Sequence, residues 1–389
     1  MIYVEREEEE MAKPEVNQIY TLVNEVFSQM TGRTDIKAVD TDSLVAMGNE
    51  LENLGKSDLW LNTLARRIGY TIDTYRTYSN NFSDLYRTQM EWGALVQKIT
   101  VEMPEATEDK VYNVGEMNGQ ALDHYIINNP KVHQKIFDKE TPYSFFITIQ
   151  QKLLQESFLS ASAMGGLINQ IFGKVQNKIE VVLEDLARIA VDNFILNLDD
   201  KQVYNLVSMY NQAKGTALTA ADALFDEAFL RYAVGIMNNV SAKMQTMSTL
   251  YNADGYDRFT PIDSQRYYVL ADFQTQLETV VEYAAFNPKY VRKTPDIALP
   301  YWQAVKDAAS INNFRTLSKI SGKVNGVEKT IDNVVGLLFD WEAIGTFRKE
   351  EYVLTTPINA RGAYYNTFWH EKQLWFNDMS ENGVVFTLN

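Results

Sequence analysis

The chain has 389 residues, a formal net charge of −15 and no cysteine. The lack of thiols excludes disulfides, thiolate catalysis and cysteine-based metal sites. A metal cluster built on the three histidines, His124, His133 and His370, is not expected either. An acidic surface repels nucleic-acid phosphate, so the charge favours either ordinary solubility or a surface that lies near nucleic acid without binding it.

The N-terminal part of the chain is polar and contains short amphipathic helical patterns. We interpret residues 1–55 as an N-terminal arm that packs on a larger body, and residues 56–94 as the segment that leads from this arm into the larger body. The first residues lack a basic segment followed by an apolar one, so no secretory signal is predicted. No run of about 18 apolar residues is present, so we predict no membrane span and expect synthesis in a cytoplasm.

The next segment has the pattern of an extended β-hairpin. Towards Met103, apolar and polar residues alternate with the period of a half-buried strand, and a second strand-like run follows Pro142. We predict that these two runs pair. About 40 residues, from Pro104 to Pro142, would then connect them, whereas hairpin loops usually have about two to five. In a protein that tiles a shell, such an extended loop over residues 95–150 would lie on the neighbouring subunit. The predicted apolar contact residues are Ile99, Val101, Phe145, Ile147 and Ile149.

A long helix is predicted directly after the hairpin, within a segment that we assign to residues 151–209. Apolar residues recur at gaps of three and four from Ser160 to Asn197 without a proline. A helix over about residues 162–197 would be roughly 50 Å long and would act as a spine. The predicted apolar stripe comprises Leu167, Ile171, Val175, Ile179, Leu183 and Leu186.

The remaining sequence mixes strand, helix and loop patterns. Residues 210–345 are typical of a separate α+β lobe, and residues 346–389 form a last segment with further strand patterns. An apolar run at the end of the chain predicts a terminal strand within a sheet. Ser321-Gly322-Lys323 lacks the upstream glycine of a phosphate-binding loop. We therefore predict an α+β fold with no catalytic, cofactor or metal site.

The order of these elements resembles that of the major capsid protein of tailed double-stranded DNA phages, which has the Hong Kong 97 fold. Three runs carry the resemblance: residues 92–99 at the entry to the extended loop, residues 152–158 before the spine, and residues 359–370. The third run is similar to an Asn-Pro-Arg-Gly-aromatic run in short-tailed phages of the phi29 group, with Ala360 in place of the proline. The resemblance covers roughly residues 55–389. It implies a peripheral domain that starts at residues 56–94 and returns at residues 346–389, and an axial domain at residues 210–345.

The resemblance implies a subunit that self-assembles into the hexamers and pentamers of an icosahedral shell around the phage genome, without sequence-specific DNA binding. It also implies a scaffolding protein and a portal as partners, procapsid maturation, assembly in the host cytoplasm, and a final location in the virion capsid. Some members link a loop lysine covalently to an asparagine of a neighbour. The predicted loop contains Lys110, Lys131, Lys135 and Lys139, and nothing in the sequence marks any of them for that reaction.

Three alternatives remain open at this stage. An encapsulin is a bacterial shell of the same fold that encloses enzymes. A soluble α+β enzyme or binding protein could use the long hairpin as a lid over its site. A tail or portal protein would form a ring of fixed number and not a closed shell.

Overall fold

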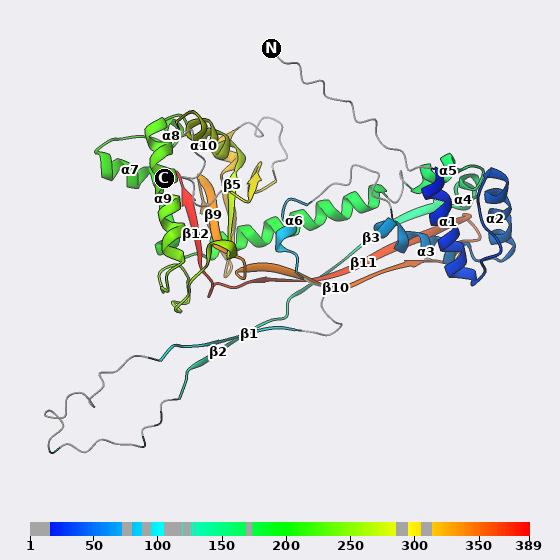
Figure 1. Ribbon diagram of the computed structural model, residues 1–389, viewed down its shortest axis with the longest axis horizontal. Coiled ribbons are helices and arrows are strands. Elements are labelled where there is room, and N and C mark those ends of the chain that lie inside the picture. Colours follow the sequence, from blue (N-terminus) through cyan, green and yellow to red (C-terminus); the bar gives the residue numbers. More distant parts are fainter. Residues whose placement is uncertain are drawn as a thin grey trace, which may run out of the picture. The chain divides into compact units, whose positions relative to one another are not determined.

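A computed structural model describes residues 16–71, 80–87, 95–104, 129–168, 173–284, 295–304 and 313–389, together with Gly119, Tyr125 and Ile127. The chain separates into two compact units. Unit 1 comprises residues 1–92, 140–187 and 346–374, and unit 2 comprises residues 93–139, 188–345 and 375–389. Helix α6 (Gly173–Asn197) and strands β10 (Ile344–Thr355) and β11 (Tyr364–Asn377) contribute residues to both units (Figure 1).

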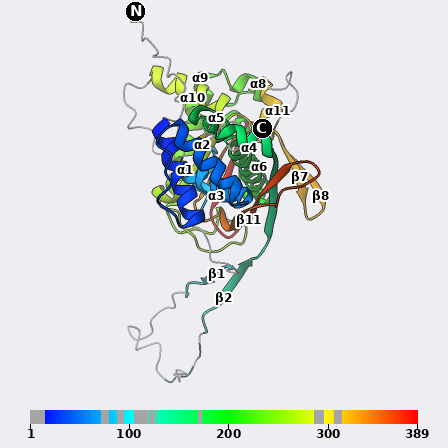
Figure 2. The same cartoon turned by 90° about the vertical axis from the view of Figure 1, so that its right-hand side faces the viewer.

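Unit 1 packs short helices against one face of a three-stranded sheet. Helices α1 (Val16–Thr31), α2 (Thr41–Asn53) and α3 (Ser57–Thr71) lie side by side (Figures 1 and 2). The sheet has the order β10-β11-β3, and β3 (Glu140–Gln150) pairs antiparallel with β11. Helices α4 (Gln151–Ser157) and α5 (Ala161–Leu167) follow β3, and a short 3-10 helix, η1, spans Ser83–Leu85.

The core of unit 1 forms where the apolar stripes of these helices meet the sheet. Leu22 and Phe27 of α1 are fully buried with Trp60 of α3, and Ile149 and Trp369 contribute from the sheet. The helices predicted for residues 1–55 are therefore part of a folded core, whereas the acidic run at residues 7–10 lies outside the described residues.

Unit 2 is built around a five-stranded sheet with the order β4-β12-β9-β5-β6. Every residue of the neighbouring strands β9 (Val334–Asp340) and β12 (Gly383–Thr387) is buried, because the sheet is covered on both faces. The predicted C-terminal strand is thus confirmed as β12, which lies between β9 and β4 (Val203–Asn205). The sheet is completed by β5 (Gln265–Leu270) and β6 (Ile297–Leu299).

Helices and two hairpins complete unit 2. The helices of unit 2 are α7 (Leu206–Lys214), α8 (Ala220–Ala223), α9 (Glu227–Met244), α10 (Ala271–Ala284) and α11 (Phe314–Leu317), with 3-10 helices η4 (Asp200–Gln202) and η5 (Ile262–Ser264). Strands β7 (Ile320–Val324) and β8 (Val327–Ile331) form one hairpin, and β1 (Val96–Val101) and β2 (Val132–Phe137) form another.

The strand pairing predicted for the extended loop is wrong. β1 pairs with β2, not with the run after Pro142, which forms β3 and pairs with β11. Pro142 is accommodated inside β3 because this strand lies at the edge of its sheet, where a missing N–H donor breaks no ladder. The compact units therefore place the end of the loop segment near residue 139, earlier than the predicted residue 150.

The other unit boundaries also differ from the predicted domains. Unit 2 begins its central segment at residue 188, within α6, and not at residue 210, and it takes residues 375–389 from the predicted return segment. The first and last helical residues of this region lie close to those predicted for the spine. Ser160 caps α5 by accepting a hydrogen bond from Ala163 N at 3.1 Å, and α6 ends at Asn197. Residues 169–172, which would join α5 to α6, lie outside the described residues.

Candidate assembly site at the extended hairpin

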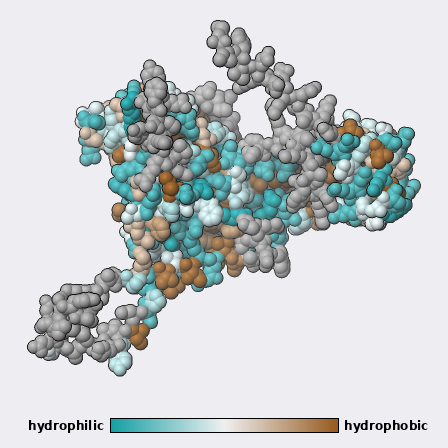
Figure 3. All heavy atoms as spheres, viewed as in Figure 1, coloured by the Kyte–Doolittle hydropathy of each residue, from teal (hydrophilic) through white to brown (hydrophobic). Residues whose placement is uncertain are grey.

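The β1–β2 hairpin exposes its apolar side chains. Its outward face carries Ile99 and Val101 from β1, and Val132 and Ile136 from β2. Their exposed fractions are 60%, 53%, 57% and 55%, respectively. Hydrophobic side chains are accordingly visible on the hairpin in the space-filling view (Figure 3). A strand at the surface of a protein normally turns its apolar residues towards the core and its polar residues towards water. The opposite arrangement in this hairpin indicates a contact surface.

The opposite face of the hairpin is polar and half-buried. Lys98 and Lys135 are direct cross-strand partners on this face, as are Thr100 and His133. Like charges directly opposite each other destabilise a strand pair unless an acceptor lies between them. The two lysines therefore require a common acidic partner.

Unit 2 supplies that partner in a cluster that we call the acidic socket, which consists of Asp254, Glu342, Asp378 and Glu381. Lys98 Nζ lies 3.1 Å from Asp378 Oδ2 and 3.0 Å from Glu342 Oε2, and it also contacts Glu381. Lys135 Nζ lies 3.0 Å from Asp378 Oδ1 and also contacts Asp254. Asp378 thus uses its two oxygens to hold one lysine from each strand.

Asp378 is held in place from within unit 2. Its Oδ1 accepts hydrogen bonds from Ser380 N at 3.0 Å and from Ser380 Oγ at 2.6 Å. Burial alone would raise the pKa of Asp378, but the Ser380 hydrogen bonds and the charges of Lys98 and Lys135 outweigh it and lower the pKa to about 2. Asp378 is therefore an ionised acceptor at neutral pH.

Further polar contacts extend along the hairpin. Arg258 Nη2 donates to Thr100 Oγ1 at 2.8 Å and lies 3.2 Å from Glu381 Oε1. The His133 ring lies 4.8 Å from the Tyr256 ring, and its Nε2 lies 2.7 Å from Glu102 Oε1.

An aromatic contact completes the attachment at the base of the hairpin, where the centroids of the Phe137 and Phe376 rings are 5.4 Å apart. The hairpin is consequently attached to the rest of unit 2 mainly by charge and hydrogen bonding.

The predicted contact residues separate into two groups. Ile99 and Val101 lie on the exposed outward face of the hairpin. Phe145, Ile147 and Ile149 belong instead to β3 in unit 1, where Ile149 is fully buried and the other two pack against the core. Their assignment to the extended loop is therefore wrong, because β3 uses its apolar face within its own unit.

The predicted spine residues are divided between α5, which contains Leu167, and α6, which contains Val175, Ile179, Leu183 and Leu186. Leu167, Ile179 and Leu183 are buried in the core of unit 1, and Val175 packs against it. Leu186 is half-buried, and Ile171 lies outside the described residues. A rigid role for the helix in assembly stays a prediction.

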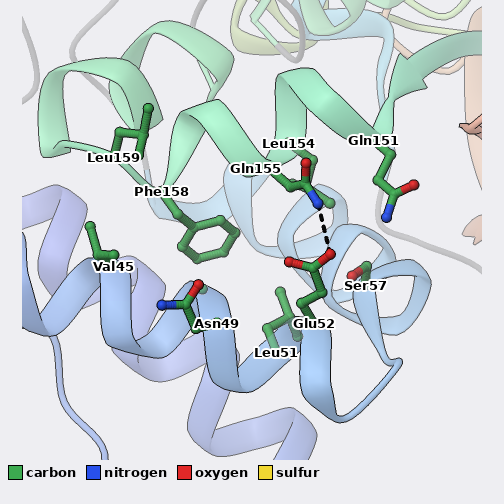
Figure 4. Close-up of a pocket in the computed structure, with 11 residues that line it drawn as sticks. Val45, Asn49, Leu51, Glu52, Ser57, Gln151, Leu154, Gln155, Phe158 and Leu159 are labelled. Carbon is green, nitrogen blue, oxygen red and sulfur yellow. Dashed lines mark hydrogen bonds between the residues drawn. The ribbon is translucent and has the colours of Figure 1, made fainter.

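A small pocket lies between α2 and α4 in unit 1 (Figure 4). Gly48 allows the Phe158 ring to approach closely, since a Cβ at this position would come within 2.7 Å of that ring. Gln155 Nε2 donates to Glu52 Oε1 at 2.7 Å across the rim. The cavity volume of about 70 Å³ is well below the ~300–1,000 Å³ of typical small-molecule sites. We assign this pocket no ligand.

The described part of the chain offers no group of three or more histidine, aspartate or glutamate side chains placed to hold a metal ion. In the same residues, no helix combines the length and apolar character needed to cross a membrane.

Comparison with protein families decides the class of protein. Residues 21–387 match the Phi29-like phage major capsid protein family. The chain belongs to this family. It is a major capsid protein that forms a phage shell. The family, together with the order of extended hairpin, long helix and C-terminal return to both sheets, confirms the predicted α+β, Hong Kong 97-like fold.

Several solved phage capsid structures match the chain at low sequence identity. The capsid of Staphylococcus phage Andhra has 12% identity, a TM-score of 0.49 and coverage of 80% of this chain and 85% of that chain. The capsid of cyanophage P-SCSP1u has 12% identity and a TM-score of 0.47, over 82% of this chain and 90% of that chain. The mature capsid of bacteriophage PhiM1 has 10% identity and a TM-score of 0.44, over 81% and 89%. No curated protein matches the sequence.

Sequence reasoning missed most of this site. The predicted hairpin has Val132, Lys135 and Ile136 in its long connection, although residues 132–137 alternate apolar and polar side chains as β1 does. That alternation was the available signal for a second strand. The acidic socket had no such signal, because Asp254, Asp378 and Glu381 are brought to the hairpin only by the fold.

Proposed function

We propose that this major capsid protein assembles into the hexamers and pentamers of an icosahedral shell around double-stranded DNA, and that the outward face of the β1–β2 hairpin is one of its inter-subunit contacts. The observation that carries the proposal is the exposed apolar set Ile99, Val101, Val132 and Ile136 on an arm whose polar face is already satisfied. A closed shell requires heterologous contacts that repeat around rings, and an arm with one unpaired apolar face supplies such a contact.

Modest contacts are sufficient for assembly. Burying one isoleucine side chain contributes about 1.5–3 kcal/mol, and each subunit repeats its contacts with several neighbours. The net charge of −15 supports a shell that encloses DNA without binding it in a sequence-specific way. A scaffolding protein and the portal are the further partners that we propose, with assembly in the host cytoplasm and no enzymatic activity.

The test compares two variants of the outward face. Ile99→Ser combined with Ile136→Ser removes apolar surface, whereas Gln97→Ser combined with Gln134→Ser removes polar side chains from the same face. We expect the first variant to stay folded by circular dichroism but to lose closed particles in electron microscopy, with and without a co-expressed scaffolding protein. The glutamine variant should assemble. Normal particle yield from the isoleucine variant would overturn the role of this face.

A further inference from the structure

We propose that the acidic socket is an electrostatic latch, which holds the extended hairpin against the rest of unit 2 and from which the hairpin can be released without unfolding the sheet of that unit. The inference rests on the proposed role of the hairpin as an assembly arm. It identifies the charged contact that fixes the position of this arm. It follows from three features of the contact between hairpin and socket.

First, the charges on the two sides are complementary and specific. The hairpin contributes Lys98 and Lys135, whereas the socket contributes four carboxylates, of which Asp378 has a fully buried side chain. The two lysines would repel each other across the strand pair without Asp378 between them. Removing the lysines would leave a buried carboxylate unpaired, which is the costly way to break such a contact.

Second, the position of Asp378 in the socket is fixed by residues of unit 2 that lie outside the hairpin. Ser380 donates to Asp378 through its backbone and its hydroxyl, and Asp378 N donates to Ala343 O at 2.7 Å. These bonds do not involve the hairpin. The position of the main acceptor is therefore fixed whether or not the lysines are bound.

Third, the apolar contact that would be lost on release is small. The ring contact of Phe137 with Phe376 lies at the base of the hairpin, while Ile99, Val101 and Ile136 face outwards. Lifting the hairpin would hydrate ammonium and carboxylate groups and would expose little apolar surface. Such a contact can open in water, whereas a shared apolar core cannot.

Hydrogen–deuterium exchange on the unassembled full-length chain tests the latch. We would compare Lys98→Gln combined with Lys135→Gln against the control Lys131→Gln, which removes a lysine that pairs with Glu102 of the hairpin itself. A two-stranded hairpin is only marginally stable in water. The released hairpin should therefore fray, and we expect its amides to exchange at least about tenfold faster. Amides of β5, β9 and β12 should keep their protection in the double variant, and the control should behave like the unmodified chain.

Two outcomes would overturn the proposal. Unchanged protection of β1 and β2 would mean that the lysines do not hold the hairpin. Loss of protection in β9 and β12 as well would mean that the charged cluster is part of the fold of unit 2 and not a latch.

A distance measurement gives an independent reading. Because the chain has no cysteine, spin labels can be placed at Gln134→Cys on the hairpin and Thr246→Cys on the exposed surface of unit 2. We expect a narrow distance distribution that becomes broad in the lysine double variant, and a distribution that stays narrow would contradict release. Both readings use unassembled protein, so failure of the latch is distinguishable from failure of the shell contact, which is read from particle yield.

Discussion

Strands β2 and β3 are separated only by Asp138 and Lys139, and both alternate apolar and polar residues, yet they bury opposite kinds of side chain. β3 turns Ile149 into the core of unit 1. β2 turns Lys135 towards the acidic socket and leaves Ile136 exposed. The period of two thus identifies a strand without showing which face its own chain covers. In a subunit of a shell, the uncovered apolar face is available to another copy.

The largest expected effect comes from placing the same charge on the two apolar faces. Ile149→Asp would bury a carboxylate in the core of unit 1 and should lower the free energy of unfolding by more than about 4 kcal/mol. Ile99 lies on an exposed face, so Ile99→Asp should change the free energy of unfolding by less than about 0.5 kcal/mol. Denaturant unfolding of the unassembled chain, followed by circular dichroism, measures both. Similar losses in the two variants would contradict the assignment of faces.

This comparison also shows why the sequence predicted some elements and not others. Local patterns placed the end of the spine at Asn197 and identified the buried C-terminal strand, because helical periodicity and a continuous apolar run are properties of neighbouring residues. Strand partners are not local. β3 pairs with β11, more than 200 residues away, and Pro142 obscured its first part. The acidic socket joins residues from distant segments, so no spacing in the sequence could reveal it.

Lowering the pH should have a smaller effect on stability. It should weaken the contact at the polar face of the hairpin and leave the apolar face unchanged. The pKa of Asp378 is lowered from 3.8 to about 2 in the folded chain. Its contribution is therefore fully present above the unfolded pKa and is lost as the pH falls from about 4 to 2. The shift corresponds to a stability on the order of 2 kcal/mol.

Denaturant unfolding across this pH range should show the loss in the unmodified chain, and Asp378→Asn should remove that part of the pH dependence. An equally steep loss in the Asn variant would assign the acid sensitivity to other carboxylates. The apolar residues of the outward face, Ile99, Val101, Val132 and Ile136, have no titratable side chains. The contact that they make should therefore not depend on pH in this range.

The smallest effect is expected at the start of β3. In the hairpin contact the strands contribute the lysines, whereas here the strand contributes the carboxylate. There the strand contributes a carboxylate, Glu140, which contacts Lys349 of β10 and Lys372 of β11. These two lysines hold the pKa of Glu140 below its usual value. Lys349 is buried and would lose its charged partner in Glu140→Gln, whereas Lys372 is partly exposed and can be hydrated.

We expect Glu140→Gln to lower the melting temperature by a few degrees, because one neutral acceptor remains for Lys349. The control Glu351→Gln breaks an exposed pair with Arg348 in the same sheet and should have almost no effect. Exchange of β1 and β2 amides should stay unchanged in both variants, since neither touches the acidic socket. Faster exchange in the hairpin of Glu140→Gln would show that the contact at Glu140 also holds the arm, and the two charged contacts would then act as one.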